Sequence, residues 1–198
     1  MKHSQRGYSL VELSIVLAII AVVIAGAVTG VQTILRSNNT VRTIATTNKA
    51  VGAITAKLMR DSNYTNATTA NLTNASMGVW DSKDINAGAV TNAYGGQVYV
   101  GALSADENGI SKLQAYVYTL TGVPTAACVD LVMGIEPLGV TIGVQNELVT
   151  ATTAAKTTAY GTIVKKPGTA LASNNVVGAC APSTDTGYAT VTFTVPRS

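Results

Sequence analysis

The chain has 198 residues, enough for one domain with a long appendage, and only 12% of them are charged, against roughly 25% in an ordinary soluble domain. The formal net charge of +3 includes Lys2 and Arg6, so the rest of the chain holds eleven Lys and Arg against ten Asp and Glu, which argues against a nucleic-acid partner. The single histidine, His3, belongs to the same short stretch, which argues against His-based catalysis or a His metal site elsewhere.

The first seven residues form a short basic leader that ends in Gly7. Residues 13–35 then contain no charge, and these 23 residues are long enough to cross a bilayer, which takes about 20. The basic leader predicts an N-terminus in the cytoplasm. An ordinary secretory signal is cut after its apolar core, whereas here the small residue Gly7 precedes the core. We therefore expect a cut after Gly7 that leaves the apolar helix on the mature protein.

Glu12 is a carboxylate placed at the start of this apolar segment. Such an acid costs a few kcal/mol if it enters the membrane without a partner. A cut after Gly7 would create an α-amino group on Tyr8, four residues away, and that amine is the natural counter-charge, in the same chain or in a neighbour. The positive end of the helix dipole also favours an acid at this position.

The run Gly7-Tyr8-Ser9-Leu10-Val11-Glu12-Leu13 with the apolar segment behind it resembles the class III signal of type IV pilins and pseudopilins. The resemblance implies that a membrane prepilin peptidase cuts between Gly7 and Tyr8 and methylates the new terminus at Tyr8. It also implies that Glu12 is the family's assembly glutamate. Tyr8 departs from the commoner Phe or Met, but it is still bulky and partly apolar.

Beyond residue 35 the apolar residues continue at helical spacing, which predicts one helix over about residues 8–61, roughly 80 Å long. Its second half should pack on a globular domain through one apolar face, made of Val41, Ile44, Ala45, Val51, Ile54, Leu58 and Met59.

Gly26 and Gly30 form a small-xxx-small pair that permits close helix approach and weakens the helix by about 1 kcal/mol per glycine. In the resembled filaments this part of the helix can unwind on assembly, usually near a proline. No proline occurs before Pro124 in this chain. We expect local melting between about residues 25 and 30.

The remainder predicts a loop at residues 62–75, then strands at 97–103 and 112–120 joined through the turn at 106–109. The two acids of that turn suggest either a calcium site or a solvated turn, and one short acidic turn favours the latter. Pro124 then opens a short helix over residues 125–134.

Strands follow at residues 139–144 and 187–195, with surface loops over 150–180. This order predicts an α+β fold with an antiparallel sheet laid on the C-terminal half of the long helix. The two cysteines, Cys128 and Cys180, are far apart in a chain with an export-like N-terminus. They predict a disulfide, the alternative being two buried thiols.

The chain length, the Pro-led helix carrying Cys128 and the second cysteine at 180 resemble the type IVb pilins of the toxin-coregulated, bundle-forming and conjugative thin-pilus group. The seven-residue leader is shorter than theirs and more typical of type IVa. The resemblance implies a structural pilin, not an enzyme and without cofactor or metal, that polymerises into a helical homo-oligomer for adhesion, aggregation, motility or conjugation. A minor pilin, a type II secretion pseudopilin and an enzyme with a pilin-like anchor are the alternatives.

The expected parts are a cleaved leader at 1–7, a transmembrane and filament-core helix at 8–35, and a globular head at 36–198. The resemblance implies an inner-membrane stage, with prepilin peptidase and an assembly platform as partners, followed by an extracellular pilus.

Overall fold

The computed structural model describes residues 9–74, 76–146, 160–181 and 187–197. The chain divides into two compact units, Met1–Asn38 and Asn39–Ser198. One helix, α1 (Leu10–Leu58), contributes its first part to one unit and its second part to the other. The predicted helix over residues 8–61 is therefore confirmed within a few residues at either end.

The second half of α1 packs on the sheet with a face that matches the predicted one in part, since Val51, Ile54 and Leu58 are buried and Ile44 packs against the core. Its buried residues are Thr40, Thr43, Thr47, Ala50, Val51, Ile54 and Leu58. Val41 and Met59, predicted to be buried, are 64% and 51% exposed. The buried face begins with threonines because their small side chains let the helix approach the sheet, and one of them accepts a hydrogen bond from Tyr94 (Tyr94 Oη to Thr40 Oγ1, 2.6 Å).

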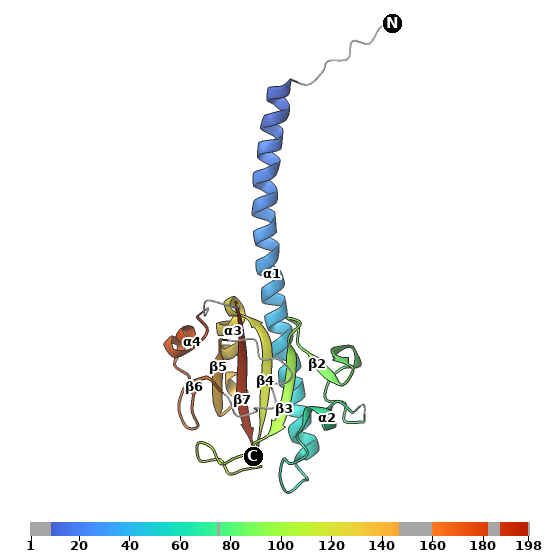
Figure 1. Ribbon diagram of the computed structural model, residues 1–198, viewed down its shortest axis with the longest axis vertical. Coiled ribbons are helices and arrows are strands. Elements are labelled where there is room, and N and C mark those ends of the chain that lie inside the picture. The colour runs from blue at the N-terminus through green and yellow to red at the C-terminus, as the bar shows by residue number, and fades with distance from the viewer. Residues whose placement is uncertain (1–8, 75, 147–159, 182–186, 198) are drawn as a thin grey trace. The chain divides into compact units, whose positions relative to one another are not determined.

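The described part of the head is an α+β unit with seven strands in one antiparallel sheet. Figure 1 shows how its helices and strands are arranged. The strands are β1 (Ile85–Asn86), β2 (Ala89–Thr91), β3 (Gln97–Ala102), β4 (Ala115–Pro124), β5 (Thr141–Gln145), β6 (Thr162–Lys165) and β7 (Tyr188–Pro196). The helices are α2 (Thr69–Leu72), α3 (Thr125–Ile135) and α4 (Ser173–Ala179), with single 3₁₀ turns η1 (Ser82–Asp84) and η2 (Glu136–Leu138).

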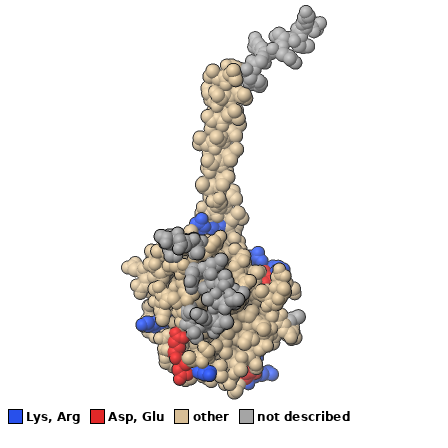
Figure 2. All heavy atoms as spheres, in the orientation of Figure 1, with Lys and Arg blue, Asp and Glu red and all other residues tan. Residues whose placement is uncertain are grey.

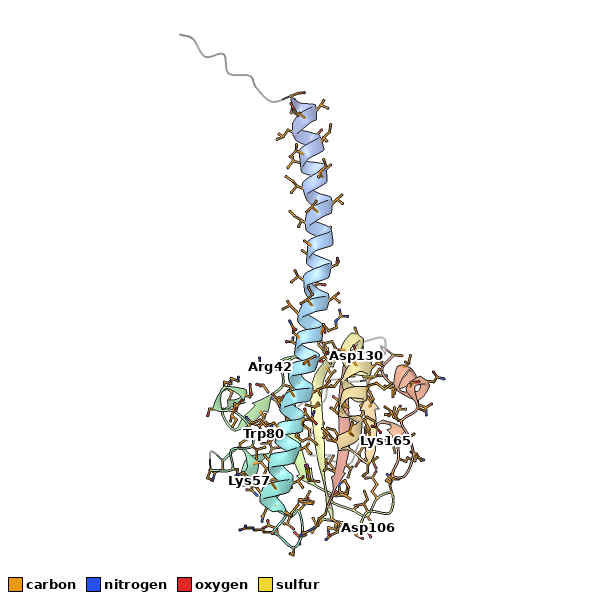
Figure 3. The ribbon with its side chains drawn as sticks, turned by 180° about the vertical axis from the view of Figure 1, so that it is seen from behind. Arg42, Lys57, Trp80, Asp106, Asp130 and Lys165 are labelled. Atoms are coloured by element: carbon orange, nitrogen blue, oxygen red, sulfur yellow. A yellow bond between two sulfur atoms is a disulfide. The ribbon has the colours of Figure 1, made fainter. Side chains whose placement is uncertain are left out.

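The last strand in the chain lies inside the sheet, whose order is β1-β2-β3-β4-β7-β5-β6. The alternation along β7 turns Val191 and Phe193 to the core, where Phe193 stacks on Tyr118 with ring centroids 5.2 Å apart. The α1 and α3 helices cover this face of the sheet, as the view from behind shows (Figure 3). The opposite residues of β7 are threonines that are also buried, and Thr192 pairs with Thr119 through their hydroxyls at 3.2 Å.

Most long elements of the head match the sequence prediction. The hairpin of β3 and β4, the helix α3, and the strands β5 and β7 lie within a few residues of their predicted bounds. The prediction of loops alone was wrong at α2, inside residues 62–75, and at β6 and α4, inside 150–180. These elements are only four to seven residues long, so packing fixes them where local periodicity is too short to register. Part of the 150–180 segment lies outside the described residues.

The disulfide expected between Cys128 and Cys180 is present, with both residues buried. It joins α3 to the residue that follows α4, with a sequence separation of 52. The closed loop carries β5 and β6, the outer strands on one side of the sheet.

We expect the Cys128→Ser, Cys180→Ser double variant to lose about 4 kcal/mol of unfolding free energy, since the bridge closes a loop of about 50 residues in the unfolded chain. Urea unfolding of the full chain with and without reductant measures this. The reductant should destabilise the native chain and leave the double variant unchanged. An equal response of the two proteins would contradict a stabilising bridge.

Burial raises the pKa of several tyrosines in the core or against the sheet. It raises the pKa of Tyr118 to about 12 and that of Tyr160 to about 12, and it also raises the pKa of Tyr116. Tyr116 donates from its hydroxyl to the Val51 carbonyl of α1 at 3.2 Å, which joins the sheet to the helix. In each case the fold favours the neutral phenol over the phenolate.

A group whose folded pKa is raised contributes stability that is complete below its unfolded pKa, about 10 for tyrosine, and is lost as pH rises through the folded value. We therefore expect the head to lose stability between about pH 10 and pH 12. In a pH titration, the ultraviolet absorbance of tyrosinate should rise in two phases. The phase at higher pH should coincide with the unfolding that circular dichroism detects. A single phase in the folded state would contradict it.

Candidate functional site

The first turn of α1 presents one carboxylate, Glu12, at the head of an otherwise uncharged helical segment. Ser9 begins the turn: its carbonyl accepts from the Leu13 N–H at 3.1 Å and its hydroxyl accepts from the Val11 N–H at 3.4 Å. The Glu12 side chain is exposed. Gly7 and Tyr8, the predicted cleavage pair, lie outside the described residues.

Fifteen large apolar side chains follow Ser9 on this unit and are all exposed, with exposed fractions from 46% at Ile20 to 86% at Leu10. By length and composition α1 can cross a membrane. These side chains point outward all round the helix, so the first part of α1 has no single apolar face of the kind that packs on a head. They are Leu10, Val11, Leu13, Ile15, Val16, Leu17, Ile19, Ile20, Val22, Val23, Ile24, Val28, Val31, Ile34 and Leu35.

The Gly26 and Gly30 pair lies within continuous helix. The intervening Thr29 donates from its hydroxyl to the Gly26 carbonyl at 2.9 Å, and Thr33 donates likewise to the Thr29 carbonyl at 3.1 Å. These bonds keep the two hydroxyls satisfied inside an apolar segment, and such back-bonding slightly destabilises and often bends a helix. The sequence analysis named the glycines but missed Thr29. Its position three residues after Gly26 could have predicted the hydrogen bond to the Gly26 carbonyl.

On the described part of the head three ion pairs form, and charged side chains occupy only small patches of the face that Figure 2 shows. Arg42 pairs with Asp84 at 3.2 Å, Lys49 with Asp81 at 2.7 Å, and Lys165 with Glu136 at 2.6 Å. The hydrogen bond and charge of Lys49 lower the pKa of Asp81 below its usual value. Of the three, only the pair of Lys49 and Asp81 has both side chains exposed, and such exposed pairs stabilise weakly.

The described residues contain no group of three or more His, Cys, Asp or Glu side chains placed to hold a metal ion. In the β3–β4 turn, which suggested calcium as an alternative, the Asp106 carboxylate accepts a hydrogen bond from the Lys112 N–H at 2.6 Å. Glu107 and Ile110 exchange backbone hydrogen bonds across the same turn. The carboxylate of Asp106 thus closes the loop.

Two family models match the chain. The prokaryotic N-terminal methylation motif matches residues 2–28, and the model described as PilS N terminal matches residues 32–195. The major structural subunits of the bundle-forming pilus from Escherichia coli O111:H- and from strain O127:H6 are each 29% identical over 179 residues. These matches cover 88% of this chain and 90% of each relative.

Solved structures of pilins share the fold. TcpA, a type IV pilin from the Vibrio cholerae El Tor biotype, matches 79% of this chain and 98% of its own, with a TM-score of 0.52 and 20% identity. The type IVb pilin from Salmonella typhi matches 76% and 95%, with a TM-score of 0.51 and 17% identity.

The chain therefore belongs to the PilS family of type IVb pilins. The superfamily and branch that the sequence resembled are confirmed, and so is the pilin fold of a long helix with an antiparallel sheet. Its function is that of a structural pilus subunit, since its family and relatives are structural pilins.

Proposed function

We propose that this pilin is a major subunit that waits in the inner membrane, loses residues 1–7 and polymerises through its N-terminal helix into an extracellular helical filament. The observation that carries this is the exposed apolar surface of residues 10–35 with Glu12 at its start. The match to the N-terminal methylation motif supports processing between Gly7 and Tyr8 by a prepilin peptidase, with methylation of Tyr8. An inner-membrane platform is the expected partner for extraction and assembly.

The apolar surface sets the energetics of both states. Burial of one large aliphatic side chain is worth about 1.5–3 kcal/mol, so fifteen of them in water would cost more than an ordinary domain's stability of about 5–15 kcal/mol. Lipid removes this cost before assembly, and the helices of neighbouring subunits remove it in the fibre. The segment at residues 8–35 thus serves first as a membrane span and then as filament core, with the head at 36–198 outside that core.

Glu12 provides the register for this apolar packing. Apolar helices slide past one another with little change in energy, whereas a buried carboxylate requires one particular partner. The α-amino group on processed Tyr8 supplies the positive charge, and in a filament the amine of an adjacent subunit meets Glu12. A subunit that enters out of register would leave both charges unpaired.

We expect Glu12→Ala to be processed normally but to assemble poorly, because the Tyr8 amine loses its partner. Breaking a buried pair costs about 3–5 kcal/mol, so the yield of filaments should fall by more than about a hundredfold. Mass spectrometry of the membrane fraction tests for an N-methyltyrosine terminus, and electron microscopy of sheared surface material measures filaments.

Ser14→Ala is the matched control, because the Ser14 hydroxyl already donates to the Val11 carbonyl at 2.7 Å within the same turn. Filaments from Ser14→Ala should be normal. Normal filaments from Glu12→Ala would refute the register role, whereas a retained leader in the native chain would refute cleavage after Gly7.

We further propose that the helix loosens near Gly26 and Gly30 on assembly. Each glycine lowers helix stability by about 1 kcal/mol, and the Thr29 hydroxyl competes for the Gly26 carbonyl between them. No atom outside the local helix backbone lies within 4 Å of an added Cβ at either glycine, so alanine fits in the helical state.

The Gly26→Ala, Gly30→Ala double variant should stabilise the helix by about 2 kcal/mol, which corresponds to roughly thirtyfold slower local amide exchange. Hydrogen exchange of the full chain in micelles measures this, and filament yield should fall if loosening is needed. Gly52→Ala, an equally open position in the second half of α1, is the control. Unbroken helix at residues 25–30 in a filament map would contradict the proposal.

A further inference from the structure

The head contains a hollow of about 480 Å³ beside η1 that plays no part in the assembly proposed above. It is lined by described residues from the end of α2 to the start of β1, within 72–74 and 78–85. Its lining contains equal numbers of apolar and polar side chains. The apolar ones are Leu72, Val79, Trp80 and Ile85, and the polar ones are Thr73, Asn74, Asp81 and Ser82; Gly78 also lines it.

Trp80 gives the hollow a rigid aromatic wall. Its side chain is largely buried, with the residue 9% exposed, and its indole N–H points inward and donates to the Tyr118 hydroxyl at 3.4 Å. Figure 3 places Trp80 beside α1. A ring anchored from inside keeps its orientation when a ligand arrives, so little side-chain entropy is lost on binding.

The polar wall is also held in place and carries no net charge. Asn74 accepts hydrogen bonds at its amide oxygen from the Ser76 N–H at 3.2 Å and the Ser76 hydroxyl at 3.0 Å. The Asp81 carboxylate is neutralised by the Lys49 ammonium at 2.7 Å. Among the described lining residues only Asp81 is charged, and it is already paired, whereas a neutral ligand with several hydroxyls finds amide, hydroxyl and carboxylate partners.

We propose that this hollow binds one neutral pyranose unit of a glycan. A pyranose has apolar C–H faces that suit Trp80 and the aliphatic residues, and a rim of hydroxyls that suits Asn74, Asp81 and Ser82. The volume falls in the usual range for small-ligand sites, about 300–1,000 Å³. The proposal gives the pilin a recognition function in addition to its structural one.

Trp80 is the only tryptophan in the chain, so its fluorescence reports directly on this hollow. The experiment titrates the full-length chain, solubilised in a detergent without a sugar headgroup, with the methyl glycosides of glucose, galactose, mannose and N-acetylglucosamine. We expect a saturable change of Trp80 emission in the millimolar range for at least one glycoside. No saturable change with any of the four would overturn the proposal.

Asn74→Ala separates binding in the hollow from non-specific effects. It should raise the apparent dissociation constant about tenfold, as expected for one lost hydrogen bond. Asn63→Ala is the matched control, because Asn63 makes the same two contacts to Thr65 that Asn74 makes to Ser76, and it does not line the hollow. Equal weakening by both variants, or by neither, would overturn the assignment, and thermal unfolding of each variant checks that the head is folded.

Ser82→Ala provides a second test at another polar residue of the lining. It too should weaken binding, by a few-fold. Because binding is measured on solubilised subunits, failure of this proposal leaves filament assembly untouched, and failure of assembly in the Glu12 variant leaves binding measurable.

Discussion

The exposed apolar surface of the first part of α1 is the main physical constraint on this molecule. No soluble domain could leave fifteen large aliphatic side chains in water, and a helix that is apolar all round cannot bury them on one flat partner. It needs surroundings on every side, which only lipid or a ring of similar helices supplies. On our proposal, one carboxylate in that surface makes the two environments unequal, since the processed terminus of a neighbouring chain would offer Glu12 an amine and hydrocarbon offers none.

The second half of the same helix packs on the head instead, and its buried residues differ in kind. There α1 must lie close to a sheet, and its buried face begins with Thr40, Thr43 and Thr47 before it becomes aliphatic at Val51 and Ile54. Threonine is small enough for close packing, and its hydroxyl can bond to another segment of the head, as the hydrogen bond from Tyr94 to Thr40 shows. Three ion pairs and a low share of charged residues leave little charge on the head, which limits repulsion between heads brought together in a fibre.

The length and regularity of each element decide whether it could be predicted from the sequence. The N-terminal signal is a strict local arrangement, and the hairpin, α3 and β7 are long and regular enough to show their periodicity. The buried face of α1 was predicted correctly at Val51, Ile54 and Leu58. Its threonines were missed because hydropathy ranks threonine below Val41, although packing distance favours the smaller residue. The two-residue β1 and the four-residue β6 exist only through pairing with their neighbours. The hollow at Trp80 carries no motif, since its residues come together through the path of an irregular segment; the lone tryptophan was its one visible sign.

The disulfide compensates for a weakness that this topology creates. The chain leaves the sheet after β4, forms α3, β5, β6 and α4 at one side, and then returns so that β7 lies between β4 and β5. The strands β5 and β6 therefore depend on the last segment of the chain to join them to the rest of the sheet. Cys128 and Cys180 close this excursion at its two ends, at the start of α3 and just after α4. The outer strands thus stay near their partners even when β7 opens locally, which suits a subunit that must keep its shape outside the cell.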